Sequence, residues 1–153
     1  MPATREDVPL ILTLIRELAD YEKLAHQVSA TEAGLAATLF GGAPGAEVRI
    51  ARWNGEPAGF ALFFPNYSTF LGRSGLYLED LYVRPAFRGR GVGRSLLRAL
   101  AAIAVERGYG RMEWWVLDWN APAIGFYEKL GAEPMNDWTV FRLTGDALTR
   151  LAE

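Results

Sequence analysis

The sequence predicts an α/β fold in which helices flank a mixed, partly antiparallel sheet, and three patterns support this class. Two strand-like runs surround Asn54-Gly55, a dipeptide typical of tight hairpin turns. A third strand-like run at 76–83 leads into a glycine-rich turn and a helical pattern, and an apolar run follows at 112–117. Strand, helix and strand in this order favour a crossover that joins parallel strands.

Length and composition fit one globular domain, which we expect to span 1–153 around a single core. The chain is 50% hydrophobic and 22% charged, and its net charge of −2 gives no footprint for nucleic acid. The absence of cysteine excludes disulfides and thiolate nucleophiles, and a single histidine argues against a metal site. No apolar run is long enough to span a bilayer and no signal pattern is present, so we expect a cytoplasmic protein without a membrane partner.

Two capping patterns predict helices in the first third of the chain. Thr4 is a helix cap with a carboxylate three residues later, and apolar residues then recur at helical spacing: Leu10, Ile11, Leu14, Ile15 and Leu18. The segment Ser29 to Glu32 is a second capping box, which opens a short helix that ends near Phe40.

The central part of the chain is expected to form the sheet. Strands are predicted at 47–53 and 57–64 around the hairpin turn, and at 76–83, where Arg84-Pro85 ends the run. A helix follows the glycine-rich turn, and a nearly continuous apolar strand follows that helix at 112–117.

The last third begins with a well-marked helix. Asn120 is a good N-cap, Pro122 suits the first turn, and Gly131 ends the helix. A further strand is expected at 139–143, and a terminal helical turn or two at 146–151.

The stretch Arg88-Gly89-Arg90-Gly91-Val92-Gly93 joins a predicted strand to a predicted helix. Glycines let backbone amides approach an anion closely, and a helix start adds unpaired N–H groups and the positive end of the helix dipole. The stretch lacks the Lys-Ser/Thr pair of a P-loop and the acidic ribose partner of a dinucleotide site. It therefore suits a diphosphate, and a flexible turn with solvated arginines is the alternative.

The pattern Arg-x-x-Gly-x-Gly after a strand resembles the coenzyme A pyrophosphate loop of the GNAT family of N-acetyltransferases. Three other stretches resemble the polyamine (spermidine/spermine) acetyltransferase branch of that family: Glu17-Leu18-Ala19-Asp20-Tyr21-Glu22, Leu78-Glu79-Asp80-Leu81-Tyr82-Val83 and Trp119-Asn120-Ala121-Pro122-Ala123-Ile124-Gly125-Phe126-Tyr127. The resemblance implies a mixed central sheet flanked by helices, with a strand before the first helix. Because only Met1-Pro2-Ala3 precede the helix cap, that strand is either truncated or begins upstream.

The resemblance also implies acetyl-CoA as co-substrate, without a metal. The amides of the glycine-rich loop, with Arg88 as charge partner, would hold the diphosphate, and the backbone of Leu81 to Val83 would hold the pantetheine arm as an added strand. Asn120 would be both a helix cap and a coenzyme contact. The full set expected to bind the coenzyme is Leu81, Tyr82, Val83, Arg88, Gly89, Arg90, Gly91, Val92, Gly93, Arg94, Asn120, Ala123 and Phe126.

Tyr127 and Glu79 are the expected catalytic residues. Tyr127 ends an Asn-x-x-Ala-x-x-Phe-Tyr pattern that resembles the family's thiolate-protonating tyrosine, and a phenol with a pKa of about 10 stays protonated near neutrality. From composition alone, a core tyrosine is the alternative. An amine is mostly ammonium at neutral pH, so Glu79 or a relayed water must accept its proton. Strand alternation puts Glu79 on one face with Leu81 and Val83, and Asp80 on the opposite face as a structural residue.

Acidic side chains are expected to line the pocket for a cationic acceptor. The substrate-binding candidates are Tyr21, Glu22, Glu79, Glu113 and Asp137, and ordinary solvated charges are the alternative for each carboxylate. Two departures from the polyamine branch are a shorter segment from Gly131 to Trp138 and Leu130 in place of a basic residue. Polyamines, other diamines, lysine-like amines such as thialysine, and aminoglycosides all remain candidates.

The predicted function is transfer of acetyl from acetyl-CoA to a primary amine of a small cationic substrate by direct attack. Two alternatives stay open: a protein N-terminal or lysine acetyltransferase, and a catalytically inactive acyl-CoA-binding regulatory module. The resemblance further implies a homodimer. The aromatic-rich region with Trp114, Trp115, Trp119 and Trp138 supports it only weakly, because these side chains could equally belong to the core. The sequence leaves open which amine is the acceptor.

Overall fold

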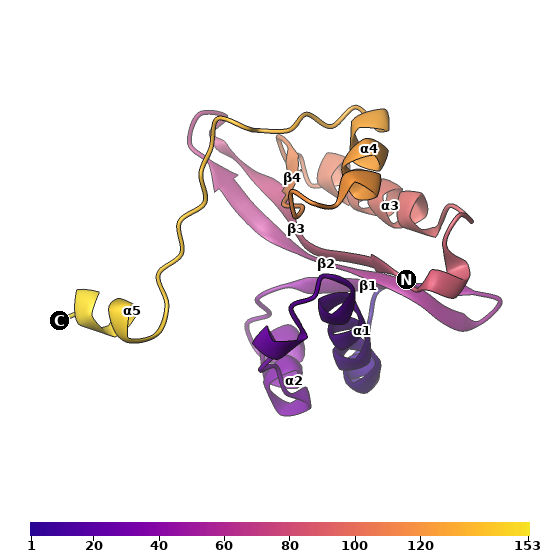
Figure 1. The fold of residues 1–153 in the computed structure, drawn as a ribbon, viewed down its shortest axis with the longest axis horizontal. Coiled ribbons are helices and arrows are strands. Elements are labelled where there is room, and N and C mark those ends of the chain that lie inside the picture. The colour runs from indigo at the N-terminus through magenta and orange to yellow at the C-terminus, as the bar shows by residue number, and fades with distance from the viewer. The chain divides into compact units, whose positions relative to one another are not determined.

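A computed structural model describes every residue from Met1 to Glu153, in two compact units that meet in sequence at Trp115 and Val116. The second unit contains α4 (Ala121–Lys129) and α5 (Gly145–Leu151) (Figure 1). The first unit contains, in order, α1 (Val8–Tyr21), α2 (Glu32–Phe40), β1 (Glu47–Trp53), β2 (Glu56–Ser68), β3 (Arg73–Val83), α3 (Val92–Glu106) and β4 (Met112–Trp114). Short 3-10 helices lie at Arg5–Asp7, Ala25–Gln27 and Pro85–Phe87.

The first unit is built on a mixed sheet with the strand order β1-β2-β3-β4. The first three strands pair antiparallel, and β4 pairs parallel with β3 after the α3 crossover. Asn54 and Gly55 have φ angles of 50° and 82°, the left-handed conformation that a two-residue hairpin turn requires at both positions. The predicted α/β class, the hairpin and the crossover are therefore confirmed.

The helices of the first unit cover both faces of this sheet. Figure 1 shows α1 and α2 on one face and α3 on the other. The core under α1 is a cluster of apolar side chains from α1, α2, β1, β2 and β3: Ile11, Leu14, Leu18, Leu39, Val48, Ile50, Phe60, Leu62 and Tyr82. On the other face, α3 buries Leu96, Leu97 and Leu100. Both faces of the sheet are therefore covered by helices.

A β-bulge interrupts the pairing of β2 with β3. Leu62 is opposite Asp80, whereas the next residue, Phe63, is opposite Leu78, so Glu79 is an extra residue in β3. The bulge reverses the alternation of faces between Leu78 and Asp80, while Glu79 is exposed and Asp80 is half-buried. Asp80 is paired with Leu62, which belongs to the core under α1, so the carboxyl of Asp80 lies beside buried apolar side chains.

The segment before α1 forms a few strand-like hydrogen bonds with β1. The Ala3 N–H donates to the Val48 carbonyl and the Ile50 N–H donates to the Met1 carbonyl, both at 2.9 Å, and Pro2 forms an isolated antiparallel bridge with Arg49. Met1 to Ala3 therefore lie antiparallel along β1, at the place where a strand before the first helix was expected.

Several predicted boundaries in the first unit shift, and β2 and β3 are both longer than predicted, with the bounds Glu56–Ser68 and Arg73–Val83. The cap of α2 is Thr31, whose side-chain oxygen accepts the Gly34 N–H at 3.0 Å, rather than Ser29. The strand predicted at 112–117 ends at Trp114. No helix of the structure combines the length and the apolar character that a membrane crossing needs.

In the second unit the predicted helix is present, with the expected capping. The side chain of Asn120 accepts the Ala123 N–H at 3.4 Å, Pro122 lies in the first turn, and Gly131 has a φ of 93° just after the helix. The strand predicted at 139–143 does not form. A strand needs a neighbour to accept and donate its backbone hydrogen bonds, and the second unit contains no strand.

Candidate active site

The glycine-rich loop forms an uncapped helix start. Gly91 is the N-cap of α3 and, like Gly89, has a positive φ, 78° and 75° respectively. No side chain caps the helix, so its first amides, those of Val92, Gly93 and Arg94, are directed away from the helix without an internal acceptor. A Cβ at Gly89 or Gly91 would meet no atom within 4 Å, so the space in front of the loop is open. This arrangement fits an anionic diphosphate.

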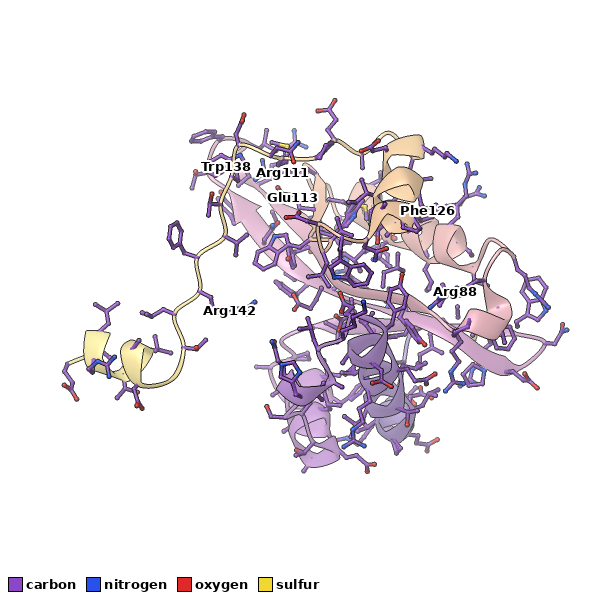
Figure 2. The ribbon with its side chains drawn as sticks, viewed as in Figure 1. Arg88, Arg111, Glu113, Phe126, Trp138 and Arg142 are labelled. Atoms are coloured by element: carbon purple, nitrogen blue, oxygen red, sulfur yellow. The ribbon has the colours of Figure 1, made fainter.

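Aromatic rings hold both arginines of the loop. The Arg88 guanidinium carbon lies 4.9 Å from the centre of the Tyr21 ring and 5.9 Å from that of Tyr82. Arg88 Nε also donates to the Val83 carbonyl at 3.0 Å. Figure 2 shows Arg88 at the end of the sheet where β3 passes into the loop. The Arg90 guanidinium lies 5.2 Å from the Trp53 ring, beside the β1–β2 turn. Two positive charges are therefore fixed at the loop.

The end of β3 has one unpaired edge. The strand β4 pairs with β3 only from Leu76 to Leu78, although β3 continues to Val83. Backbone groups of the last five residues of β3 that point away from β2 are thus left for another chain or for a ligand, except the Val83 carbonyl, which accepts the Arg88 Nε–H. On the other side β2 approaches closely at Gly59, where a Cβ would come within 2.3 Å of the Tyr82 carbonyl oxygen. The predicted residues Leu81, Tyr82 and Val83 lie in this part of β3, and the Tyr82 carbonyl is directed toward β2.

Carboxyl groups gather at the bulge of β3. Burial raises the pKa of Asp80 to about 7, and the negative charges of Glu79 and Glu22 add to the rise. The pKa of Glu22, at the end of α1, is raised by burial and by the charge of Glu79. The side chain of Glu79 itself is exposed. The structure therefore brings together two predicted residues, Glu22 and Glu79, and adds Asp80.

Asp80 was expected to be structural, and no local pattern in the sequence distinguishes it from its neighbour. Its raised pKa arises from the bulge and from the core that surrounds Leu62, both of which depend on pairing between strands. A carboxyl with a pKa near the working pH can both accept and release a proton. This group is the main addition of the structure to the site.

The carboxylate of Glu113 already has hydrogen-bond partners within the protein. It accepts hydrogen bonds from Arg111 Nε at 3.0 Å and from Asn66 Nδ2 at 3.3 Å. Figure 2 shows Arg111 and Glu113 together near β4. Part of the negative charge is therefore balanced locally, and a role of Glu113 in binding the acceptor stays a prediction.

The remaining predicted residues belong to the second unit. Asn120 is buried and caps α4, while the Phe126 and Tyr127 rings lie 5.6 Å apart, tilted by 50°. Ala123 lies in the first turn of α4, and Phe126 is labelled on that helix in Figure 2. Asp137 is exposed in the segment after α4. Their roles stay predictions that depend on the sequence motif.

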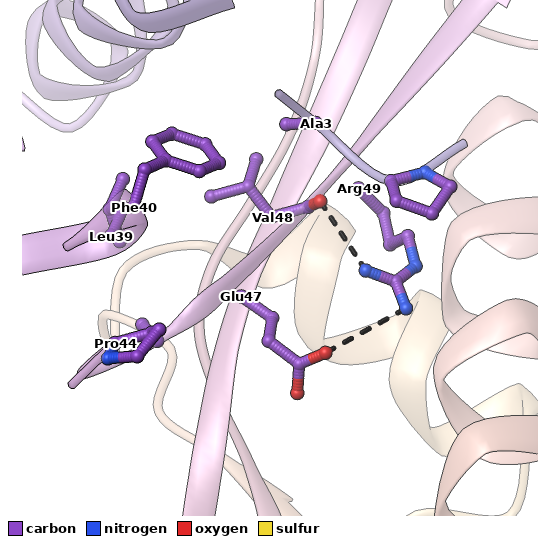
Figure 3. A pocket seen from close by; sticks show the side chains of 9 residues that line it. Ala3, Leu39, Phe40, Pro44, Glu47, Val48 and Arg49 are labelled. Atoms are coloured by element: carbon purple, nitrogen blue, oxygen red, sulfur yellow. Dashed lines mark hydrogen bonds and ion pairs between the residues drawn. The ribbon is translucent and has the colours of Figure 1, made fainter. Parts of the chain in front are cut away.

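A separate pocket of about 190 Å³ lies beside β1 and contains none of the predicted site residues. Figure 3 shows it between the start of the chain, the end of α2 and β1. Arg49 on its rim contacts Glu47 at 3.8 Å and the Val48 carbonyl at 3.5 Å. The structure holds no group of three or more His, Cys, Asp or Glu side chains that could bind a metal ion. The candidate site is therefore the loop, the free edge of β3 and the carboxyl cluster.

The sequence profile of the acetyltransferase (GNAT) family matches residues 13–132. The chain belongs to this family. Thialysine N-epsilon-acetyltransferase from Bos taurus is 40% identical over 161 residues, which cover 98% of this chain and 94% of that protein. L-ornithine N5-acetyltransferase from Arabidopsis thaliana is 38% identical over 191 residues, which cover 95% of this chain and 84% of that protein. The chain is thus similar to named amine acetyltransferases over nearly its whole length.

Solved structures show the same fold. An integron cassette protein from the mobile metagenome of V. cholerae matches with a TM-score of 0.82 and 26% identity, and the match covers 100% of this chain and 96% of that one. An aminoglycoside acetyltransferase from an uncultured soil metagenomic sample matches with a TM-score of 0.79 and 18% identity, over 95% of both chains. The α/β sheet with its flanking helices is therefore a GNAT fold, and the protein is a GNAT N-acetyltransferase.

Proposed function

We propose that this enzyme transfers acetyl from acetyl-CoA to a primary amine of a small cationic substrate, of the ornithine, thialysine or polyamine type. The observation that carries the proposal is the arrangement within β3 and the loop that follows it. An acidic cluster, a free backbone edge and an uncapped helix start with two fixed arginines succeed one another from Glu79 to Arg94. A cationic acceptor and an anionic donor each find groups of opposite charge there.

The donor is bound by backbone more than by side chains. The first amides of α3 and the charges of Arg88 and Arg90 hold the diphosphate. The edge of β3 from Leu81 to Val83 hydrogen-bonds the pantetheine amides, as an added strand would. Bound acetyl-CoA supplies the acetyl group as an activated thioester. Asn120, Ala123 and Phe126 are proposed to contact the same coenzyme from α4.

The carboxyl cluster prepares the acceptor. At neutral pH the amine arrives as ammonium, and its negative surroundings attract it. Glu79 accepts the amine's proton, directly or through water, and Asp80 shares this task because its raised pKa lies near neutrality. Glu22, Glu113 and Asp137 are proposed as further acidic contacts of a multiply charged amine. The phenol of Tyr127 donates a proton to the departing thiolate.

The choice of substrate class comes from the relatives. Two relatives that match nearly all of this chain at high identity are named for thialysine and ornithine. Both compounds are amino acids with a side-chain amine. A human spermidine/spermine N(1)-acetyltransferase-like protein 1 is 33% identical over 95% of this chain but only 22% of its own length. We therefore place amino acids with a terminal side-chain amine ahead of polyamines. We also propose that the enzyme acts in the cytoplasm as a homodimer.

The test is a thiol-release assay with acetyl-CoA and a panel of thialysine, L-ornithine, L-lysine, spermidine, an aminoglycoside and a peptide with a free N-terminus. We expect the highest kcat/KM for thialysine or ornithine, with the acetylated side-chain amine identified by mass spectrometry. A second test is Tyr127→Phe, in which only the proton donor is lost. Its turnover should fall by about a hundredfold or more, while its affinity for coenzyme A should not change.

Two outcomes would replace the proposal with its alternatives. Acetylation of the peptide alone would make the enzyme a protein acetyltransferase. Tight coenzyme A binding without acetylation of any amine in the panel would make it an acyl-CoA-binding regulatory module.

A further inference from the structure

We propose that Tyr21 is a positioning residue for the donor: its ring holds the Arg88 guanidinium at the diphosphate loop. The inference rests on the proposed use of acetyl-CoA. It also revises an expectation, because the sequence motif suggested Tyr21 as a contact of the acceptor amine. The difference matters because a donor residue and an acceptor residue change different kinetic constants when they are replaced.

The Arg88 side chain is held from two directions. Its Nε donates to the Val83 carbonyl at 3.0 Å, which leaves the far end of the guanidinium to be positioned by other contacts. Those contacts are the ring of Tyr21 at 4.9 Å and, more distantly, that of Tyr82 at 5.9 Å. A guanidinium within about 6 Å of a ring centre is attracted by the negative face of the ring. Tyr21 is therefore the nearer of two aromatic partners that fix this charge.

The ring of Tyr21 is itself placed by an anchored helix. Tyr21 is the last residue of α1, and Glu17, one turn earlier, receives three hydrogen bonds from Arg84 at 3.1, 3.2 and 2.9 Å. Arg84 also donates from Nη1 to the Pro57 carbonyl at 3.2 Å and from its backbone N–H to the Ala58 carbonyl at 2.8 Å. The end of α1 is thus tied to the end of β3, where the loop begins. This tie presents the Tyr21 ring to Arg88.

The contact argues against Tyr21 as a direct partner of the amine. A ring face that already attracts one guanidinium has less attraction left for a second cation, and the two cations would repel each other. The acidic contact on this turn is the next residue, Glu22, whose pKa is raised by burial and by the charge of Glu79. The end of α1 therefore serves both substrates, with Tyr21 on the donor side and Glu22 on the acceptor side.

The test compares two donors that differ in the diphosphate. Acetyl-CoA carries the diphosphate with its attached 3′-phosphoadenosine, and acetyl-pantetheine lacks both. Tyr21→Leu should raise the KM for acetyl-CoA by about threefold to tenfold, the range expected for loss of one cation–π contact. The rise for acetyl-pantetheine should be clearly smaller. Tyr21→Phe keeps the ring face and should restore most of the coenzyme A affinity. Tyr67→Leu, at an exposed tyrosine of the β2–β3 hairpin, is the matched control.

The outcomes separate this inference from the proposed function. Coenzyme A binding by the wild-type enzyme is measured first by calorimetry, and its absence would overturn the proposed function itself. If wild type binds and Tyr21→Leu binds equally well, the positioning role is wrong. An equal rise in KM for both donors, or a change confined to the KM of the amine, would also overturn it, since either result means that the ring does not act through the diphosphate.

Discussion

Asp80 shows how one extra residue changes the chemistry of a strand. The bulge at Glu79 leaves that residue without a partner in β2 and aligns Asp80 with Leu62 beside the core. Burial then raises the pKa of Asp80 to about 7, with further increases from the charges of Glu79 and Glu22. In the unfolded chain the carboxyl returns to its ordinary pKa near 3.8. Between these two values the folded protein holds a proton that the unfolded chain has lost.

This difference predicts that the contribution of Asp80 to stability falls as the pH rises from about 4 to 7 and then stays level. The amide of Asp80→Asn cannot ionise, so this variant should escape the loss. At pH 8 it should unfold at higher urea concentration than wild type, by up to about 4 kcal/mol in the free energy of unfolding, and at pH 4 the difference should nearly vanish.

Asp137→Asn, at an exposed carboxyl, is the control for Asp80→Asn. Its free energy of unfolding should stay close to that of wild type at both pH 8 and pH 4. Turnover of Asp80→Asn should fall while its stability rises, because the same carboxyl is proposed to share the amine's proton. Equal stabilisation at both pH values would show that the gain has another origin than ionisation.

At the scale of elements, the loop before α3 is better tested at Gly93 than at Gly91. Gly91 has a φ of 78°, so a β-branched residue there would strain the backbone whatever it did to the ligand. Gly93 lies within the helix, and a Cβ there meets only Val83 Cγ2 at 3.5 Å, an ordinary contact. Gly93→Val should therefore keep the helix while its side chain blocks the approach of the diphosphate.

We expect Gly93→Val to weaken coenzyme A binding by about tenfold to a hundredfold, the equivalent of one charge-assisted hydrogen bond lost. Calorimetry measures the affinity, and circular dichroism checks the fold. The control is Ala102→Val, at an exposed position of the same helix. Unchanged affinity in a folded Gly93→Val protein would remove the diphosphate from this loop.

Elements with local signals could be predicted from the sequence. The hairpin depends on two adjacent residues that accept positive φ, and α4 depends on a cap, a proline and a final glycine, all near one another in the chain. Of the candidate site, the loop and the acidic character of β3 could be read in the same way.

Features that depend on distant partners could not be predicted. The bulge exists only in the pairing of β2 with β3, so neither the position of Asp80 nor its pKa has a local signal. The stack of Tyr21 on Arg88 joins residues 21 and 88, which only the fold brings together. The strand expected at 139–143 has a suitable composition but no partner strand in its unit.

At the scale of the whole molecule, the segment after α4 has an unusual amount of exposed apolar surface. Trp138 is 75% exposed, Val140 55% and Phe141 92%. Contiguous exposed apolar residues commonly mark a protein interface, and backbone without hydrogen-bond partners favours pairing with another chain. In the proposed homodimer, a second copy would cover this segment.

We therefore expect sedimentation equilibrium at micromolar concentration to give twice the mass of one chain. Phe141→Asp would bury a charge in the proposed interface and should shift the equilibrium to monomer. Phe70→Asp, at a residue 97% exposed in the β2–β3 hairpin, introduces the same charge elsewhere and should leave the dimer intact. If wild type sediments as a monomer throughout, the dimer is wrong. If Phe70→Asp dissociates the dimer and Phe141→Asp does not, the interface belongs to the hairpin instead, since the two substitutions differ only in where the charge is placed.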